Sequence, residues 1–183
     1  MPETPAPVVA LLRGVNVAGR SKLAMADLRA VLTAAGLGEA RTHLQSGNVI
    51  LTPASGNLAG LSTAIEIAIA DGCGLGIRVI VRTREQLEAI VEGNPFLEPG
   101  TKPVTLHSVF LESVPESDRV SGLDPDRSPP DRFSVAGQNI YVHYPGGSGR
   151  SKLGLDYFEK KLGVAGTARN WNTVISLLGM LQE

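Results

Sequence analysis

The chain contains little cysteine and few aromatic residues: one cysteine and 4% aromatic side chains among 183 residues. The lone Cys73 can form no disulfide within the chain and offers no ligand set for zinc. Charge of neither sign is in excess, because 17 basic side chains stand against 18 acidic ones and the net charge is −1. This balance argues against a protein that coats nucleic acid through a strongly basic surface alone.

Long hydrophobic runs are also missing from the sequence. The apolar run Val8–Leu12 is too short for a membrane span or a signal peptide, and no basic segment precedes it. We therefore expect a globular protein with no membrane partner. The single cysteine fits a cytoplasmic location.

The first half of the chain alternates strand-like and helix-like patterns. Apolar runs predict strands, spacings of three and four predict helices, and Gly47 marks a hairpin turn between two strands. The order β-α-β-β-α-β followed by a helix is typical of a ferredoxin-like fold. The segments in order are Val8–Leu12, Leu28–Ala35, Arg41–Gln45, Val49–Thr52, Leu61–Ile69, Ile77–Val81 and a short helix capped by Thr83.

The second half repeats this order after a segment rich in glycine and proline. We predict an α+β protein of two tandem ferredoxin-like halves with mainly antiparallel sheets, residues 1–93 and 104–183, joined by a linker at 94–103. The alternative is that a common order of elements arose twice without duplication. The second-half segments are Val104–Leu111, Pro115–Val120, Arg132–Val135, Gln138–Tyr144, Ser151–Leu162, Val164–Ala168 and Asn170–Leu181, with a Pro/Asp-rich loop at Gly122–Asp131.

Two polar loops of the first half are candidate binding segments. The loop from Arg13 to Lys22 follows a strand, precedes a helix and differs from a phosphate-binding Walker loop by carrying Arg20 where that motif has lysine. The hairpin tip Gln45–Asn48 contributes only if it lies beside that loop. The candidate ligand-binding residues here are Arg13, Asn16, Arg20, Lys22 and Asn48. The competing interpretation is an ordinary turn with solvated charges.

Two further loops lie in the second half. Gly149–Leu153 repeats Gly19–Leu23 letter for letter, as Gly-Arg-Ser-Lys-Leu, at a different place in the order of elements. Contact with an anion at a helix start explains this recurrence, and so does a shared solution to helix capping. The segment Thr167–Thr173 precedes the last helix and again combines arginine with asparagine. The candidate ligand-binding residues of this half are Arg150, Lys152, Arg169, Asn170 and Asn172.

Five short motifs resemble one bacterial family. They are Leu11–Val17, Gln45–Val49, Asn94–Phe96, Ser151–Leu153 and Thr167–Thr173, of which the last, Thr-Ala-Arg-Asn-Trp-Asn-Thr, is the most specific. On these segments the chain resembles the family known as domain of unknown function 1697. The resemblance implies a compact α+β protein of ferredoxin-like character and supplies neither a function nor catalytic residues. Arg20 departs from relatives, which often have lysine there.

The sequence favours a non-enzymatic protein that binds a phosphate-bearing ligand, a nucleotide or a nucleic acid, through these basic loops. We assign no catalytic residue, no metal site and no cofactor, and the oligomeric state stays open. One alternative is an enzyme of phosphoryl transfer or phosphate-ester chemistry, which would need a Mg²⁺ site and a base. Another is a protein-interaction module that uses Trp171 and the Gly122–Asp131 loop.

Overall fold

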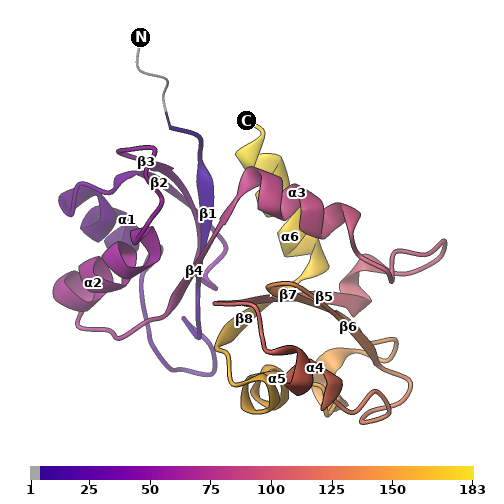
Figure 1. Ribbon diagram of the computed structural model, residues 1–183. Coiled ribbons are helices and arrows are strands. Elements are labelled where there is room, and N and C mark those ends of the chain that lie inside the picture. Colours follow the sequence, from indigo (N-terminus) through magenta and orange to yellow (C-terminus); the bar gives the residue numbers. More distant parts are fainter. Residues whose placement is uncertain (1–4) are drawn as a thin grey trace. The chain divides into compact units, whose positions relative to one another are not determined.

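Two four-stranded antiparallel sheets form the framework of the computed structural model, which describes residues 5–183 (Figure 1). The order is β2-β3-β1-β4 in the first sheet and β6-β7-β5-β8 in the second, so equivalent strands occupy equivalent places. The predicted fold of two ferredoxin-like halves is confirmed. The strands are β1 (Val8–Leu12), β2 (Gly38–His43), β3 (Asn48–Pro53), β4 (Val79–Thr83), β5 (Leu106–Leu111), β6 (Arg132–Ala136), β7 (Asn139–His143) and β8 (Gly166–Asn170).

Each half also carries three helices in the same order. In the first half α1 and α2 pack on one face of the sheet, where alternate residues of β1 (Val8, Ala10 and Leu12) join the core. In the second half the equivalent core contains Val109 and Leu111 of β5 together with Phe158 of α5. The helices are α1 (Met25–Ala34), α2 (Leu61–Cys73), α3 (Arg84–Glu92), α4 (Ser117–Ser121), α5 (Leu155–Leu162) and α6 (Trp171–Leu181), with 3-10 turns at Pro103–Thr105 and Ser148–Arg150.

The chain divides into two compact units whose borders cut through helices. One unit contains the chain up to Leu87 together with Leu177–Glu183, and the other contains Glu88–Ser176. Helices α3 and α6 therefore each contribute residues to both units. Residues 177–181 at the end of α6 therefore belong to the first unit, and residues 88–92 at the end of α3 belong to the second. We call this arrangement the exchange of helix ends.

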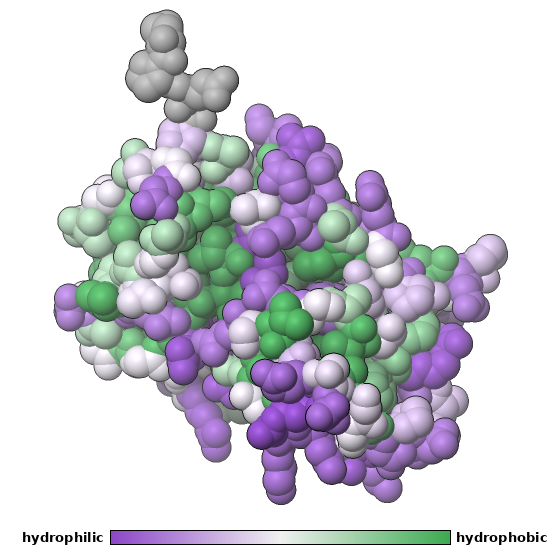
Figure 2. Space-filling model, in the orientation of Figure 1, coloured by the Kyte–Doolittle hydropathy of each residue, from purple (hydrophilic) through white to green (hydrophobic). Residues whose placement is uncertain are grey.

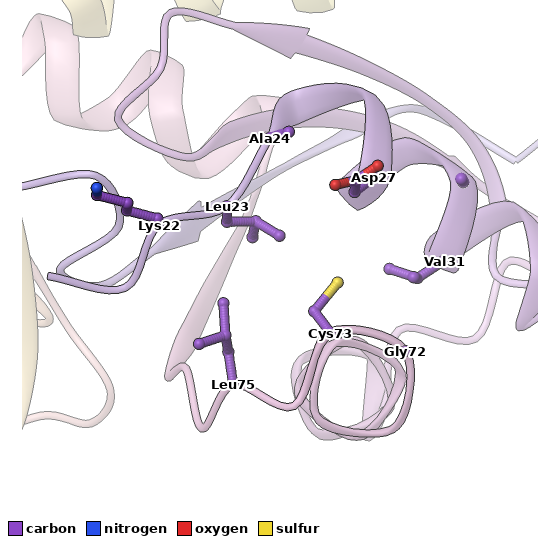
Figure 3. A pocket seen from close by; sticks show the side chains of 9 residues that line it. Lys22, Leu23, Ala24, Asp27, Val31, Gly72, Cys73 and Leu75 are labelled. Carbon is purple, nitrogen blue, oxygen red and sulfur yellow. The ribbon is translucent and has the colours of Figure 1, made fainter.

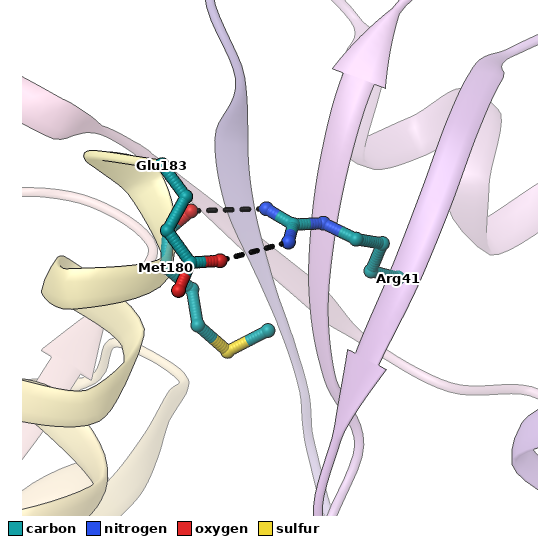
Figure 4. Close-up of polar contacts among 3 residues, drawn as sticks. All are labelled: Arg41, Met180 and Glu183. Carbon is teal, nitrogen blue, oxygen red and sulfur yellow. Dashed lines mark hydrogen bonds and ion pairs between the residues drawn. The ribbon is translucent and has the colours of Figure 1, made fainter.

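Each unit uses these helix ends on the sheet face opposite its paired helices. In the first unit Arg41 of β2 donates from Nη2 to the carbonyl of Met180 (3.0 Å) and from Nη1 to Oε2 of Glu183 (3.0 Å), as Figure 4 shows. In the second unit the hydroxyl of Tyr141 donates to the carbonyl of Ile90 (3.0 Å).

Several predicted boundaries were wrong in detail: β2 and β4 are shifted by two or three residues from the predicted 41–45 and 77–81, α1 begins at Met25 and β5 at Leu106. Three further differences affect the candidate loops. The helix expected from Ser151 begins at Leu155, because the Ser151 hydroxyl accepts a hydrogen bond from the amide of Leu153 (3.0 Å) and closes a local turn instead. The last strand is shifted to Gly166–Asn170. Asn48 is the first residue of β3 and not part of the turn, whose left-handed positions are Leu44 and Gly47.

Candidate functional site

The two polar loops of the first unit lie against each other. The antiparallel register sets Leu11 of β1 opposite Asn48 of β3, so the loop that leaves β1 meets the tip of the β2–β3 hairpin. Asn16 joins them: its Nδ2 donates to the carbonyls of Leu23 (2.8 Å) and Gln45 (2.7 Å), and its Oδ1 accepts from the amide of Leu23 (2.9 Å). The side chain of Asn16 therefore connects the Arg13–Lys22 loop to the tip of the β2–β3 hairpin.

The Arg13–Lys22 loop does not form the anion cradle of a phosphate-binding loop. The amide of Arg20 donates to the carbonyl of Val17 (3.0 Å), and the amide of Asn16 donates to that of Ser21 (3.2 Å). Because these N–H groups bond within the loop, they do not point together at a ligand. Helix α1 begins at Met25, three residues beyond Lys22. Arg13, Arg20 and Lys22 are solvent-exposed around this turn.

Asn48 has a structural position at the hairpin. It is fully buried, and its Nδ2 donates to the carbonyl of His43 (2.9 Å) and to the hydroxyl of Ser46 (3.1 Å). The adjacent Gly47 lies so close to the chain leaving β1 that a Cβ there would meet the Cβ of Leu12 at 2.7 Å. The residue types of the hairpin tip thus have a packing explanation at these two positions.

In the second unit, Ser128 ties the Gly122–Asp131 loop to the Gly146–Lys152 loop. The Ser128 hydroxyl accepts from the amide of Lys152 (3.1 Å), and Nε of Arg127 donates to the carbonyl of Lys152 (2.9 Å). These bonds hold Arg127 and Lys152 next to each other although 24 residues lie between them.

A basic groove opens beside this junction. This basic groove has a volume of about 510 Å³, and its lining consists of Arg127, Lys152, Gly154, Asp156, Tyr157, Lys160 and Lys161. It contains four cationic side chains and one carboxylate, all from the second unit. Figure 2 shows hydrophilic residues gathered over the surface of α4 and α5. Two loops supply one cation each, Arg127 and Lys152, and the last turn of α5 supplies Lys160 and Lys161.

Arg127 is held in place at the groove by one further contact, with a tyrosine that is itself hydrogen-bonded. Its guanidinium carbon lies 4.1 Å from the centre of the Tyr157 ring, a cation–π geometry. The hydroxyl of Tyr157 in turn accepts from the amide of Asp124 (2.9 Å). Arg127 is thus positioned by neighbouring groups of its own unit.

The other second-unit candidates lie elsewhere. Arg169 is buried on the sheet face opposite α5, where its Nη1 donates to the hydroxyl of Thr167 (2.7 Å) and the carbonyl of Ala168 (2.9 Å). Burial lowers its pKa to about 10. Asn170 caps α6, because its Oδ1 accepts from the amide of Asn172 (3.0 Å).

The structure therefore separates residues that the sequence grouped together. Lys152 lines the basic groove, Arg150 is exposed on the preceding 3-10 turn, and Arg169 lies on the other face of the sheet. Sequence reasoning missed Arg127, Lys160 and Lys161. The helical spacing of Asp156 to Lys160 and of Tyr157 to Lys161 was the available signal for a shared face.

A smaller cavity in the first unit contains the lone cysteine. It has a volume of about 290 Å³, and Figure 3 shows the thiol of Cys73 and the carboxylate of Asp27 facing the same space between α1 and α2. Burial and the negative charge of Asp27 raise the pKa of the Cys73 thiol. This environment favours the neutral thiol and not the nucleophilic thiolate.

Residues 5–183 form neither a cluster of metal-ligating side chains nor a helix that could span a membrane. No group of three or more His, Cys, Asp and Glu side chains is gathered closely enough to hold a metal ion. Within the same range, no helix combines the length and the apolar character that crossing a membrane requires.

The fold and the groove define an α+β protein of two ferredoxin-like units, the second of which carries a cluster of cations. Comparison of the sequence with family models matches residues 6–141 to DUF1697, described as a protein of unknown function. The chain belongs to this DUF1697 family.

One solved structure is similar over almost the whole length. It is described as that of conserved bacterial protein SP0830 from Streptococcus pneumoniae. The TM-score is 0.73 at 24% sequence identity, and the match covers 97% of this chain and 99% of that one. This similarity supports the fold alone. Comparison with curated proteins gives no match.

Proposed function

We propose that this protein binds a phosphate-bearing ligand, a nucleotide or a nucleic acid, in the basic groove of its second unit and catalyses no reaction on it. The observation that carries the proposal is the placement of four cations around one opening of about 510 Å³ with a single carboxylate among them. This volume is within the usual range of small-molecule sites.

The chemistry of the lining fits phosphate oxygens. Arginine offers a planar fork that can bond two oxygens at once, and lysine ammonium groups act as compact charges. Arg127 is fixed by the Tyr157 ring and by the Lys152 carbonyl, so its fork keeps a defined direction. Lys152, Lys160 and Lys161 add charge from two segments of the unit. Together they provide an electrostatic attraction that salt would weaken.

The proposal is tested by titrating the full chain with nucleotides and short oligonucleotides at about 50 mM and about 200 mM salt. We expect binding at low salt that weakens as salt rises. The variants Arg127→Gln and Lys152→Ala should weaken it, by about tenfold each if a charge-assisted hydrogen bond is lost.

A matched control is available in the same unit. Lys102 is exposed and does not line the groove, so Lys102→Ala removes the same charge and should leave affinity unchanged. Absence of binding to all probes at low salt would refute the proposed function. An equal loss in Lys102→Ala and Lys152→Ala would show that only net charge matters and would refute the assignment to the groove.

We also infer a cytoplasmic location. Its support is the single free Cys73, because disulfide frameworks are typical of oxidising compartments and rare in the reducing cytoplasm. Cell fractionation with an antibody to the untagged protein tests this inference. Recovery in a membrane or secreted fraction would contradict it.

A further inference from the structure

We infer that the basic groove recognises a chain of two or three linked phosphates, and that a nucleoside attached to that chain adds little to the affinity. This inference rests on the proposed function, because it names the class of ligand for the same site. It stands on the charge count, the distribution of the cations and the state of the one aromatic side chain in the lining.

The charge of the groove matches a ligand with several negative charges. Arg127, Lys152, Lys160 and Lys161 contribute four positive charges and Asp156 one negative charge, which leaves three in excess. A single phosphate carries too little charge to neutralise this excess, whereas linked phosphates carry about one further charge per group. The carboxylate of Asp156 offsets part of the attraction that the four cations exert on an anion.

The cations come from three segments of the unit. Arg127 and Lys152 come from loops that hydrogen-bond to each other, whereas Lys160 and Lys161 come from the last turn of α5. Successive helical residues project about 100° apart, so the two lysines approach the groove from different directions. A linear chain of phosphates can contact such separated cations at the same time, which one compact phosphate cannot do.

The groove offers no exposed aromatic ring on which a base can stack. Tyr157 is the aromatic residue of the lining, but it is only 8% exposed. One face of its ring is already covered by the guanidinium of Arg127 at 4.1 Å. Stacking on aromatic side chains is the common way to hold a base without reading its sequence. The phosphate chain therefore has to provide the recognition.

The test measures affinities of the full chain for inorganic phosphate, pyrophosphate, tripolyphosphate, AMP and ATP by calorimetry at about 50 mM salt. We expect affinity to rise by about tenfold with each added phosphate, and ATP and tripolyphosphate to agree within about threefold. Lys160→Ala and Lys161→Ala should each weaken tripolyphosphate binding while changing the affinity for phosphate much less. Far-ultraviolet circular dichroism of each variant establishes that it is folded.

The outcomes separate this inference from the proposed function. If inorganic phosphate binds as tightly as tripolyphosphate, or if ATP binds more than tenfold more tightly than tripolyphosphate, the inference fails while phosphate-ligand binding stands. If no probe binds, both fail. If Lys22→Ala weakens tripolyphosphate binding and Lys152→Ala does not, the site lies in the first copy of the Gly-Arg-Ser-Lys-Leu string and the inference about the groove is overturned.

Discussion

Arg82 and Arg169 occupy equivalent positions in the two halves. Arg82 of β4 pairs with Val9 of β1, and Arg169 of β8 pairs with Ser108 of β5, one residue before the strand end in both cases. Both are buried, and burial lowers the pKa of each guanidinium to about 10. Both also donate from Nη1 to the carbonyl of the preceding residue. A buried arginine at the end of this strand is therefore a shared feature of the repeated fold.

His107 makes stability depend on pH. Its Nδ1 is buried without a hydrogen-bond partner among the described residues, and burial lowers its pKa below 6.5. As pH falls below 6.5, His107 binds a proton in the unfolded chain while it stays neutral in the folded protein. The unfolded state is therefore stabilised, and the free energy of unfolding decreases. One such group gives a slope of at most about 1.4 kcal/mol per pH unit.

His107→Phe removes this contribution and keeps a ring beside Tyr144, which packs edge-on against the imidazole at 5.1 Å. Urea unfolding at pH 7.5 and pH 5.0 measures the effect. The variant should lose less stability than the parent on acidification. His143, whose pKa is also lowered by burial, leaves part of the dependence in place. Equal pH dependence in both proteins would contradict the prediction.

Gly72 allows α1 and α2 to pack closely. A Cβ at this position would lie 2.4 Å from Cγ1 and 3.0 Å from Cβ of Val31. Valine is stiff at χ1 and cannot swing away, so Gly72→Ala should lower the free energy of unfolding by about 1–3 kcal/mol. Denaturant unfolding measures it. Gly76→Ala is the control, because a Cβ at this position would meet no atom within 4 Å. The double variant Gly72→Ala/Val31→Ala should recover part of the stability that Gly72→Ala loses, because it removes the Val31 methyl groups that the new Cβ would meet.

At the scale of elements, helix starts follow local side-chain chemistry. Thr83 and Gln86 form a reciprocal cap on α3: the Gln86 amide donates to the Thr83 hydroxyl (3.3 Å), and the Thr83 amide donates to Oε1 of Gln86 (2.9 Å). Asn170 caps α6 in a similar way. Both caps were readable from the sequence, because the groups involved are only two or three residues apart.

The end of α6 is held in the first unit by burial more than by its ion pair. Arg41 and Glu183 are 48% and 67% exposed at the side chain, and exposed pairs contribute about 0–1 kcal/mol. Leu181 is 3% exposed. We therefore expect Arg41→Ala to cost less than about 1 kcal/mol and Leu181→Ala about 2–4 kcal/mol. Urea unfolding of both variants decides this, and a larger loss in Arg41→Ala would contradict it.

At the scale of the whole molecule, helices α3 and α6 each contribute residues to both units. We keep 94–103 as the proposed linker between the two repeated folds. A cut after residue 93 leaves the first fragment without Leu177–Glu183, and it leaves the second without Ile90, whose carbonyl binds Tyr141. We expect each separate fragment to be expanded and to lack a cooperative unfolding transition.

Size-exclusion chromatography and thermal unfolding of the fragments 1–93 and 94–183 test this expectation. Mixing the fragments should restore a compact, cooperative species, because the missing helix ends are then supplied again. Independent cooperative folding of fragment 1–93 would show that Leu177–Glu183 is not needed and would contradict the prediction.

The fold could be predicted more fully than the candidate site. Apolar periodicity identified the strands and most helices, because burial of one face leaves a repeating pattern in the chain. It placed the start of α5 too early, since the bond between the Leu153 amide and the Ser151 hydroxyl competes with helix formation at this point. The cations of the groove were found only in part. Lys152 was named from its motif, and the helical spacing of Lys160 and Lys161 from Asp156 and Tyr157 was a signal that was missed. The approach of Arg127 to Lys152 depends on the folded path of two loops, which local spacing does not reveal.

The sequence by itself determined the repeated order of strands and helices, the cap at Thr83, and the resemblance to the family. All of these depend on residues that interact within a few positions or on the periodicity of a single element. Only the tertiary structure decided that Asn16 joins two loops, that Arg169 is buried away from Lys152, and that α3 and α6 are divided between the units. Those outcomes depend on strand register and on which sheet face a residue occupies, and neither is written in the local sequence.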